Sequence, residues 1–155
     1  MHTFFRACVF VLALSLAVPA LAADAQLGKP APDKPVKSSE RSTVITVIHE
    51  GTDSIGARLS TRLKETLNAS NLFQLNEKDM PKLRLLLNTV SEFPERPGVG
   101  SVYSVTWVFS QSENNLGYLL ARDLGAVSAD EVDALTNKLV ERTDGLAVKY
   151  RYLFQ

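Results

Sequence analysis

Cysteine and histidine are almost missing from this 155-residue chain, which holds one cysteine, Cys8, and two histidines, His2 and His49. Cys8 and His2 lie in an amino-terminal segment with the features of a cleaved signal. A chain without cysteine forms no disulfide, has no thiol nucleophile and offers no thiolate to a metal ion. A single histidine also falls short of the usual zinc ligand sets. The mature sequence therefore predicts no metal and no cofactor.

An excess of charge of either sign is also missing. The chain has 17 basic and 17 acidic residues, and removal of Arg6 with the signal leaves 16 against 17, a net charge of −1. Nucleic acids and anionic membrane surfaces normally attract proteins with a basic excess. The composition therefore predicts neither as a partner.

The amino terminus has the pattern of a secretory signal peptide over residues 1–22. Ala7 to Val18 is apolar except for Ser15, Pro19 follows, and Ala20-Leu21-Ala22 places small residues where signal peptidase reads them. Cleavage is expected after Ala22, with Ala23 as the alternative, and it leaves no inserted segment. An uncleaved anchor is the competing interpretation, but the apolar stretch is shorter than the ~20 residues of a typical spanning helix.

The predicted signal peptide indicates export to the periplasm or secretion from the cell. Cys8 lies inside the apolar stretch, upstream of where a lipid-bearing cysteine would stand, so a lipoprotein is disfavoured. Small secreted domains of eukaryotes usually contain disulfides, so their absence indicates a bacterial periplasm. Residues 23–42 are rich in Pro, Lys and Ser and predict a disordered leader, and residues 43–155 then form one domain.

Residues 43–75 have the pattern of a strand, a helix and a second strand. Thr43 to Ile48 is β-branched or apolar at every position, as in a strand covered on both faces or placed centrally. Asp53 is suited to cap a helix, whose apolar face consists of Ile55, Leu59, Leu63 and Leu67. Leu72 to Leu75 follows as a short strand.

Three longer strands are expected next. Leu83 to Phe93 is leucine-rich, but prolines on both sides favour a strand over a helix. Ser101 to Ser110 alternates regularly, and its stripe of Tyr103, Trp107 and Phe109 is more typical of core than of a ligand site. Leu116 to Leu124 is expected to pair with it, with one face made of Leu116, Tyr118 and Leu120 and the other of Leu119 and Ala121.

A long helix should close the chain. Ser128 and Glu131 have the spacing of a capping box, in which the hydroxyl and the carboxylate each accept a free backbone N–H. Asp144-Gly145 leaves two alternatives: one helix to Tyr150, or an earlier end with Val148 to Phe154 as a separate element.

The order β-α-β-β-β-β-α predicts an α/β (α+β) fold, a single two-layer domain with a mixed sheet of about five strands and two helices packed on one face. Thr43 to Leu75 resembles the opening of periplasmic α/β domains of two kinds, the amino-terminal domain of the Tol-system propeller protein and the curli secretion lipoprotein type. The resemblance rests on the strand, on the leucine face of the helix and on Ser70 to Leu75. It implies an envelope-assembly or protein-binding role and carries over no functional residue.

The sharpest candidate site lies after the first strand, where open α/β sheets often bind ligands. His49, Glu50 and Asp53 would meet there, with Ser54 as a nucleophile for a histidine base or with the carboxylates around a metal. The alternative is structural, with His49 ending a strand and Asp53 capping a helix. Arg96, in the Pro-rich connection that follows Phe93, marks a second candidate recognition point.

The sequence predicts an exported, non-catalytic domain that binds an envelope protein or a small ligand, with His49, Glu50, Asp53 and Arg96 as candidate binding residues. An edge of the sheet is a further candidate, through pairing with an extended segment. The competing hypothesis is a small hydrolase or metal-dependent enzyme at the end of the first strand.

Overall fold

The computed structural model describes residues 42–154, so the predicted signal peptide, the predicted leader up to Arg41 and Gln155 lie outside it. The elements follow in the order β1 (Thr43–Glu50), α1 (Ser54–Ala69), β2 (Phe73–Leu75), β3 (Lys82–Ser91), β4 (Gly100–Ser110), β5 (Tyr118–Ser128), α2 (Val132–Lys149) and a short 3-10 helix, η2 (Arg151–Phe154). This confirms the predicted order. None of these helices is both long and apolar enough to span a bilayer.

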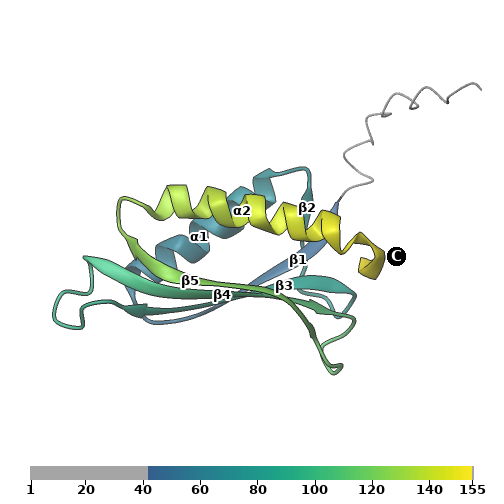
Figure 1. Ribbon diagram of the computed structural model, residues 1–155, viewed down its shortest axis with the longest axis horizontal. Helices are drawn as coiled ribbons and strands as arrows, with labels where there is room; N and C mark the ends of the chain where they lie inside the picture. The colour runs from purple at the N-terminus through teal and green to yellow at the C-terminus, as the bar shows by residue number, and fades with distance from the viewer. Residues whose placement is uncertain (1–41, 155) are drawn as a thin grey trace, which may run out of the picture. The chain divides into compact units, whose positions relative to one another are not determined.

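The strands form one mixed sheet in the order β2-β1-β3-β4-β5. β1 runs parallel to β2 and β3, whereas β3, β4 and β5 are joined by antiparallel pairing. Both helices lie on the same side of the sheet, as predicted, and the other side carries no element of residues 42–154 (Figure 1). The domain therefore has two layers.

The core lies between the helices and the sheet. The predicted leucine face of α1 is fully buried, and α2 contributes Val132, Leu135 and Leu139. Opposite them, alternate residues of β3 and β4 are buried because successive side chains of a strand point to opposite faces. They include Leu83, Leu85, Leu87, Tyr103, Val105, Trp107 and Phe109. The aromatic stripe is thus core.

The last strand differs from its predicted range. β5 begins at Tyr118 and not at Leu116, which lies in the preceding turn with 92% of its surface exposed. It also continues past Leu124, because Gly125 leaves room for the ring of Tyr103; a Cβ at Gly125 would lie 3.0 Å from the phenolic oxygen. Leu116 and Gly117, which alternation alone assigns to the strand, thus belong to the turn before it.

One of the two faces predicted for this strand was also wrong: Tyr118 and Leu120 both pack on the core side, but Leu119 and Ala121 do not share a face. The β4–β5 register shifts between Trp107 and Val108, so that Ala121 lies opposite Trp107 while Leu119 lies opposite Val108. A bulge adds one residue to one strand and so reverses the side to which the earlier residues point. Leu119 and Ala121 consequently face opposite sides of the sheet.

Helix α2 settles the alternative at Asp144-Gly145, because it runs unbroken to Lys149. Its start differs from a complete capping box. The Glu131 carboxylate accepts the Ser128 N–H at 3.0 Å, but the Ser128 hydroxyl donates to that carboxylate at 2.8 Å instead of capping the helix. The helix begins at Val132 with Glu131 as its N-cap residue, so Ser128, the last residue of β5, lies three residues before the cap position and only half of the motif forms.

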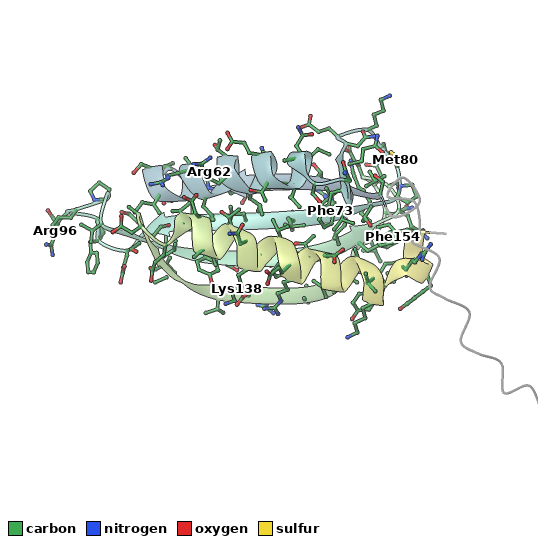
Figure 2. All side chains as sticks on the ribbon, turned by 90° about the horizontal axis from the view of Figure 1, so that it is seen from above. Arg62, Phe73, Met80, Arg96, Lys138 and Phe154 are labelled. Carbon is green, nitrogen blue, oxygen red and sulfur yellow. The ribbon has the colours of Figure 1, made fainter. Side chains whose placement is uncertain are left out.

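The carboxyl-terminal segment docks on this same domain. The ring of Phe154 packs edge-on against Phe109 with centroids 5.0 Å apart. Phe154 lies at the same end of the domain as Phe73 and Met80, opposite the tip that carries Arg96 (Figure 2). Residues 151–154 are therefore part of the fold.

Candidate functional site

His49 and Asp53 are brought together, but through a third residue. The His49 Nε2 lies 2.8 Å from the hydroxyl of Thr89 on β3, and that hydroxyl donates to Asp53 Oδ1 at 2.6 Å. A hydroxyl has a single hydrogen, so Nε2 must carry a proton and donate to Thr89. The three residues form a chain of hydrogen bonds that ends on the carboxylate.

The carboxylate of Asp53 is fully engaged. Its second oxygen accepts the Gly56 N–H at 2.6 Å, which makes Asp53 the predicted amino-terminal cap of α1. Burial raises the pKa of Asp53, but the hydrogen bonds from Thr89 and from the Gly56 N–H outweigh it and hold that pKa below its ordinary value. Asp53 is therefore a stably ionised capping group and a poor proton acceptor for catalysis.

Two glycines close the space around Thr89. A Cβ at Gly51 would lie 2.3 Å from the Thr89 hydroxyl, and one at Gly56 would lie 2.0 Å from it. Gly51 also has a φ of 156°, a backbone conformation that residues other than glycine rarely adopt. This junction of β1, α1 and β3 is packed tightly enough to leave no room for a substrate beside the hydroxyl.

Glu50 and Arg96 do not join this junction. Glu50 is exposed, and its position in β1 places it on the side of the sheet away from the helices. Arg96 lies at the tip of the β3–β4 hairpin, beyond the ends of the helices, with its guanidinium 5.7 Å from the ring centroid of Phe93 (Figure 2). The four predicted residues therefore form one structural pair and two separate surface positions.

Within residues 42–154 no cluster of three or more histidine, cysteine or acidic residues is placed to hold a metal ion. A cavity of about 580 Å³ lies at the other end of the sheet, where Met80, Val148 and Phe154 form part of its wall. A smaller one of about 240 Å³ lies beside β2. Neither is lined by His49, Glu50, Asp53 or Arg96.

The free edge of β5 is blocked by side chains. Arg142 of α2 donates to the Arg122 carbonyl at 3.1 Å and to the Asp123 carboxylate at 2.9 Å. Asp123 in turn accepts the Leu124 N–H at 3.0 Å, and Glu131 accepts the Ser128 N–H. Residues 122, 124 and 128 are separated by even numbers of residues along β5. The Arg122 carbonyl and the N–H groups of Leu124 and Ser128 therefore point to the same edge of the strand. At the opposite edge, β2 is three residues long.

The uncovered face of the sheet is the surface that sequence reasoning missed. We define the open face as the residues of β1, β3, β4 and β5 that point away from the helices, apart from the buried Lys82 and Ser110 and the strand-end residues Gly100 and Ser128. They are Val44, Thr46, Ile48, Glu50, Arg84, Leu86, Asn88, Val90, Val102, Ser104, Thr106, Val108, Leu119, Arg122, Leu124 and Ala126. Nine of these sixteen residues are aliphatic. Val90 is 61% exposed and Leu124 is 71% exposed.

Three of these aliphatic residues form a row across the strands, and the next row holds Asn88, Ser104 and Leu124. Val90 lies opposite Val102, which lies opposite Ala126 on β5. Directly opposed side chains on one face have Cβ atoms about 4.5–5.5 Å apart, so they touch. The signal was present in the sequence, since β3 and β4 carry aliphatic residues at both parities where a solvated face would carry polar ones.

The face also curves. In Figure 1 the hairpin between β4 and β5 bends away from the helices, so that its end lies below the rest of the sheet on the open side. Leu119, which is 60% exposed, belongs to that hairpin.

Comparison with known proteins adds a fold likeness. No family model matches the chain, and no curated protein matches it. Among solved structures, a hypothetical protein from Chlamydia trachomatis is similar, with a TM-score of 0.48 and 10% sequence identity over 70% of this chain and 99% of that one.

Proposed function

We propose that this protein is an exported, non-catalytic domain of the bacterial cell envelope that binds another envelope protein through the open face of its sheet. Export rests on the sequence of residues 1–22, with its apolar stretch and its Ala-Leu-Ala site. The binding role rests on one observation, the exposed aliphatic residues on the uncovered side of the sheet, which include Val90, Val102 and Leu124. The resemblance of residues 43–75 to envelope-assembly domains supports the same role.

Exposed aliphatic surface of this kind is costly in water. Single exposed apolar residues are ordinary, but monomeric proteins rarely expose a contiguous apolar patch larger than a few hundred Å². Neither edge strand of the sheet offers an alternative, because β2 is short and β5 is capped by Arg142, Asp123 and Glu131. The face is therefore favoured over the edge as the docking surface.

Site-specific photocrosslinking in living cells tests the docking role. A photoreactive phenylalanine analogue at Val90 or at Leu124 is expected to give the same covalent adduct with a second protein. The analogue at Val148 on α2, which is 66% exposed, serves as the matched control and is expected to give none. Val102→Glu should abolish the adduct, because an ion buried in an apolar interface without a partner is strongly unfavourable.

Two results would contradict the role. One is the same adduct from positions 124 and 148, which indicates unspecific proximity. The other is an adduct that survives Val102→Glu while the variant stays folded by circular dichroism. Either result removes the open face as the docking surface.

His49 provides the test against the enzyme hypothesis. His49→Ala removes one hydrogen bond to Thr89, so we expect the free energy of unfolding to fall by about 1 kcal/mol. The crosslink at Leu124 should persist, because His49 points to the helix side of the sheet. A folded His49→Ala protein that loses the cellular function while it retains this crosslink would instead support a catalytic role for His49.

A further inference from the structure

We infer that a second copy of this chain covers the open face in the free protein, so that two sheets pack face to face in a two-fold symmetric dimer. This inference rests on the proposed function, in which the open face is a docking surface. It states that a second copy of the chain covers this face when the envelope partner is absent. The aliphatic residues of the open face must otherwise remain in water. Val90, Leu119 and Leu124 each expose about 60% or more of their surface.

The size of the face agrees with what a stable dimer needs. β1, β3, β4 and β5 contribute to it, and β3 pairs with β4 over ten residues. With strands about 4.8 Å apart and a rise of about 3.3 Å per residue, four such strands span about 19 Å by 30 Å, roughly 600 Å² on each copy. Two copies then bury roughly 1,200 Å², the lower limit of specific, stable interfaces.

The side chains on the face are suited to sheet-on-sheet packing. Its residues are valine, leucine, isoleucine, alanine, threonine and serine with a few longer polar ones, and none is aromatic. Branched aliphatic side chains of this size interdigitate when two sheets stack about 10 Å apart, as in β-sandwiches. At the centre of the face, Leu86, Thr106 and Val108 are half-buried and remain partly accessible to such contact.

The charges of the face permit self-association. An isologous interface sets a surface against itself, so a surface of one sign would repel its copy. The open face has both signs, with Arg84 on β3, Arg122 on the edge strand β5 and Glu50 at the end of β1. Edge-to-edge pairing of two β5 strands is disfavoured by the side-chain caps on positions 122, 124 and 128. Face-to-face packing is therefore the mode that the structure favours.

Sedimentation equilibrium of the purified, signal-cleaved chain tests the inference. We expect a reversible monomer–dimer equilibrium at roughly 10–100 µM, the weak end for an interface of this size. Leu124→Glu and Val90→Glu should each weaken the dimer by about tenfold or more, because each carboxylate is placed in the apolar interface. Val148→Glu changes an equally exposed aliphatic residue on the helix side and should leave the equilibrium unchanged.

Thermal unfolding by circular dichroism verifies that all three variants are folded. A chain that remains monomeric at several hundred micromolar overturns the inference. A dimer that Leu124→Glu and Val90→Glu leave intact, or that Val148→Glu weakens equally, also overturns it.

The two proposals fail separately. A monomeric protein that still gives the Leu124 adduct with a different protein removes the dimer and leaves the partner role. An adduct made only of two copies of this chain removes the partner role and leaves the dimer.

Discussion

Replacing Trp107 by alanine should lower the free energy of unfolding by about 3–5 kcal/mol, the usual cost of deleting a large aromatic side chain from a core. Trp107 is fully buried in β4, between the sheet and the helices. Its indole N–H donates to the Thr143 hydroxyl at 2.9 Å, and the Arg142 guanidinium lies 5.1 Å from the ring centroid. The substitution thus removes core volume, a buried hydrogen bond and a cation–π contact together.

Urea unfolding followed by far-ultraviolet circular dichroism measures this loss, because Trp107 is the only tryptophan of the chain and its variants lack the fluorescence signal. Trp107→Phe is the matched control and should cost less, because the phenyl ring keeps most of the core volume. In both variants the Thr143 hydroxyl keeps its bond to the Leu139 carbonyl. Thr143→Val should cost about 1–3 kcal/mol, because it leaves the indole N–H buried without an acceptor. A loss below about 1 kcal/mol for Trp107→Ala would contradict the assigned core position.

The sequence predicted the order of elements correctly because the local patterns were strong. The leucine spacing of α1 and its Asp53 cap are confirmed, and so is the strand that the flanking prolines favoured over a leucine-rich helix. A hydrogen-bonded cap and a regular apolar repeat depend only on nearby residues. Such features are legible without the tertiary structure.

The predicted range of β5 and its predicted face of Leu119 and Ala121 were wrong for a tertiary reason. Alternation assigns faces only while the register is regular, and the bulge opposite Trp107 and Val108 interrupts it. The extension through Gly125 depends on the Tyr103 ring, which lies 22 residues earlier in the chain. No pattern within the strand itself reports either feature.

The candidate site was predicted in part. The structural interpretation of His49 and Asp53 agrees with their contacts, but Thr89, the residue that joins them, lies 40 and 36 positions away and has no local signal. The caps on β5 likewise depend on Arg142, 20 positions from the carbonyl that it covers. The open face follows from the layer arrangement, since two helices on one side of a sheet leave the other side uncovered.

Thr89→Val should lower the free energy of unfolding by about 2–4 kcal/mol at neutral pH. The valine has the shape of threonine but no hydroxyl, so Asp53 Oδ1 loses its donor and the His49 N–H loses its acceptor. Hydrogen bonds to charged groups contribute about 1.5–3 kcal/mol each, and leaving a buried carboxylate short of a donor adds to the loss. Thr89→Ser keeps the hydroxyl and is the matched control, expected to cost about 1 kcal/mol or less for the lost methyl group.

The pH dependence separates this mechanism from a simple packing defect. The pKa of Asp53 is below its ordinary value in the folded protein, so the carboxylate contributes stability above the unfolded pKa, about 4, and this stability is lost as the pH falls through the folded pKa. In Thr89→Val, burial still raises the pKa of Asp53, but the hydrogen bond from Thr89 no longer lowers it. The pKa of Asp53 is therefore higher in the folded variant than in the folded wild type. Acid therefore weakens the wild type more than Thr89→Val.

Urea unfolding at pH 7 and at pH 3 measures this difference. The stability gap between wild type and Thr89→Val should narrow at the lower pH, because only the wild type loses the contribution of a carboxylate whose pKa the Thr89 hydroxyl lowers. The gap for Thr89→Ser should stay constant. A gap for Thr89→Val that is the same at both pH values would show that Asp53 is not held ionised by the Thr89 hydroxyl, and the junction of β1, α1 and β3 would then be stabilised by packing alone.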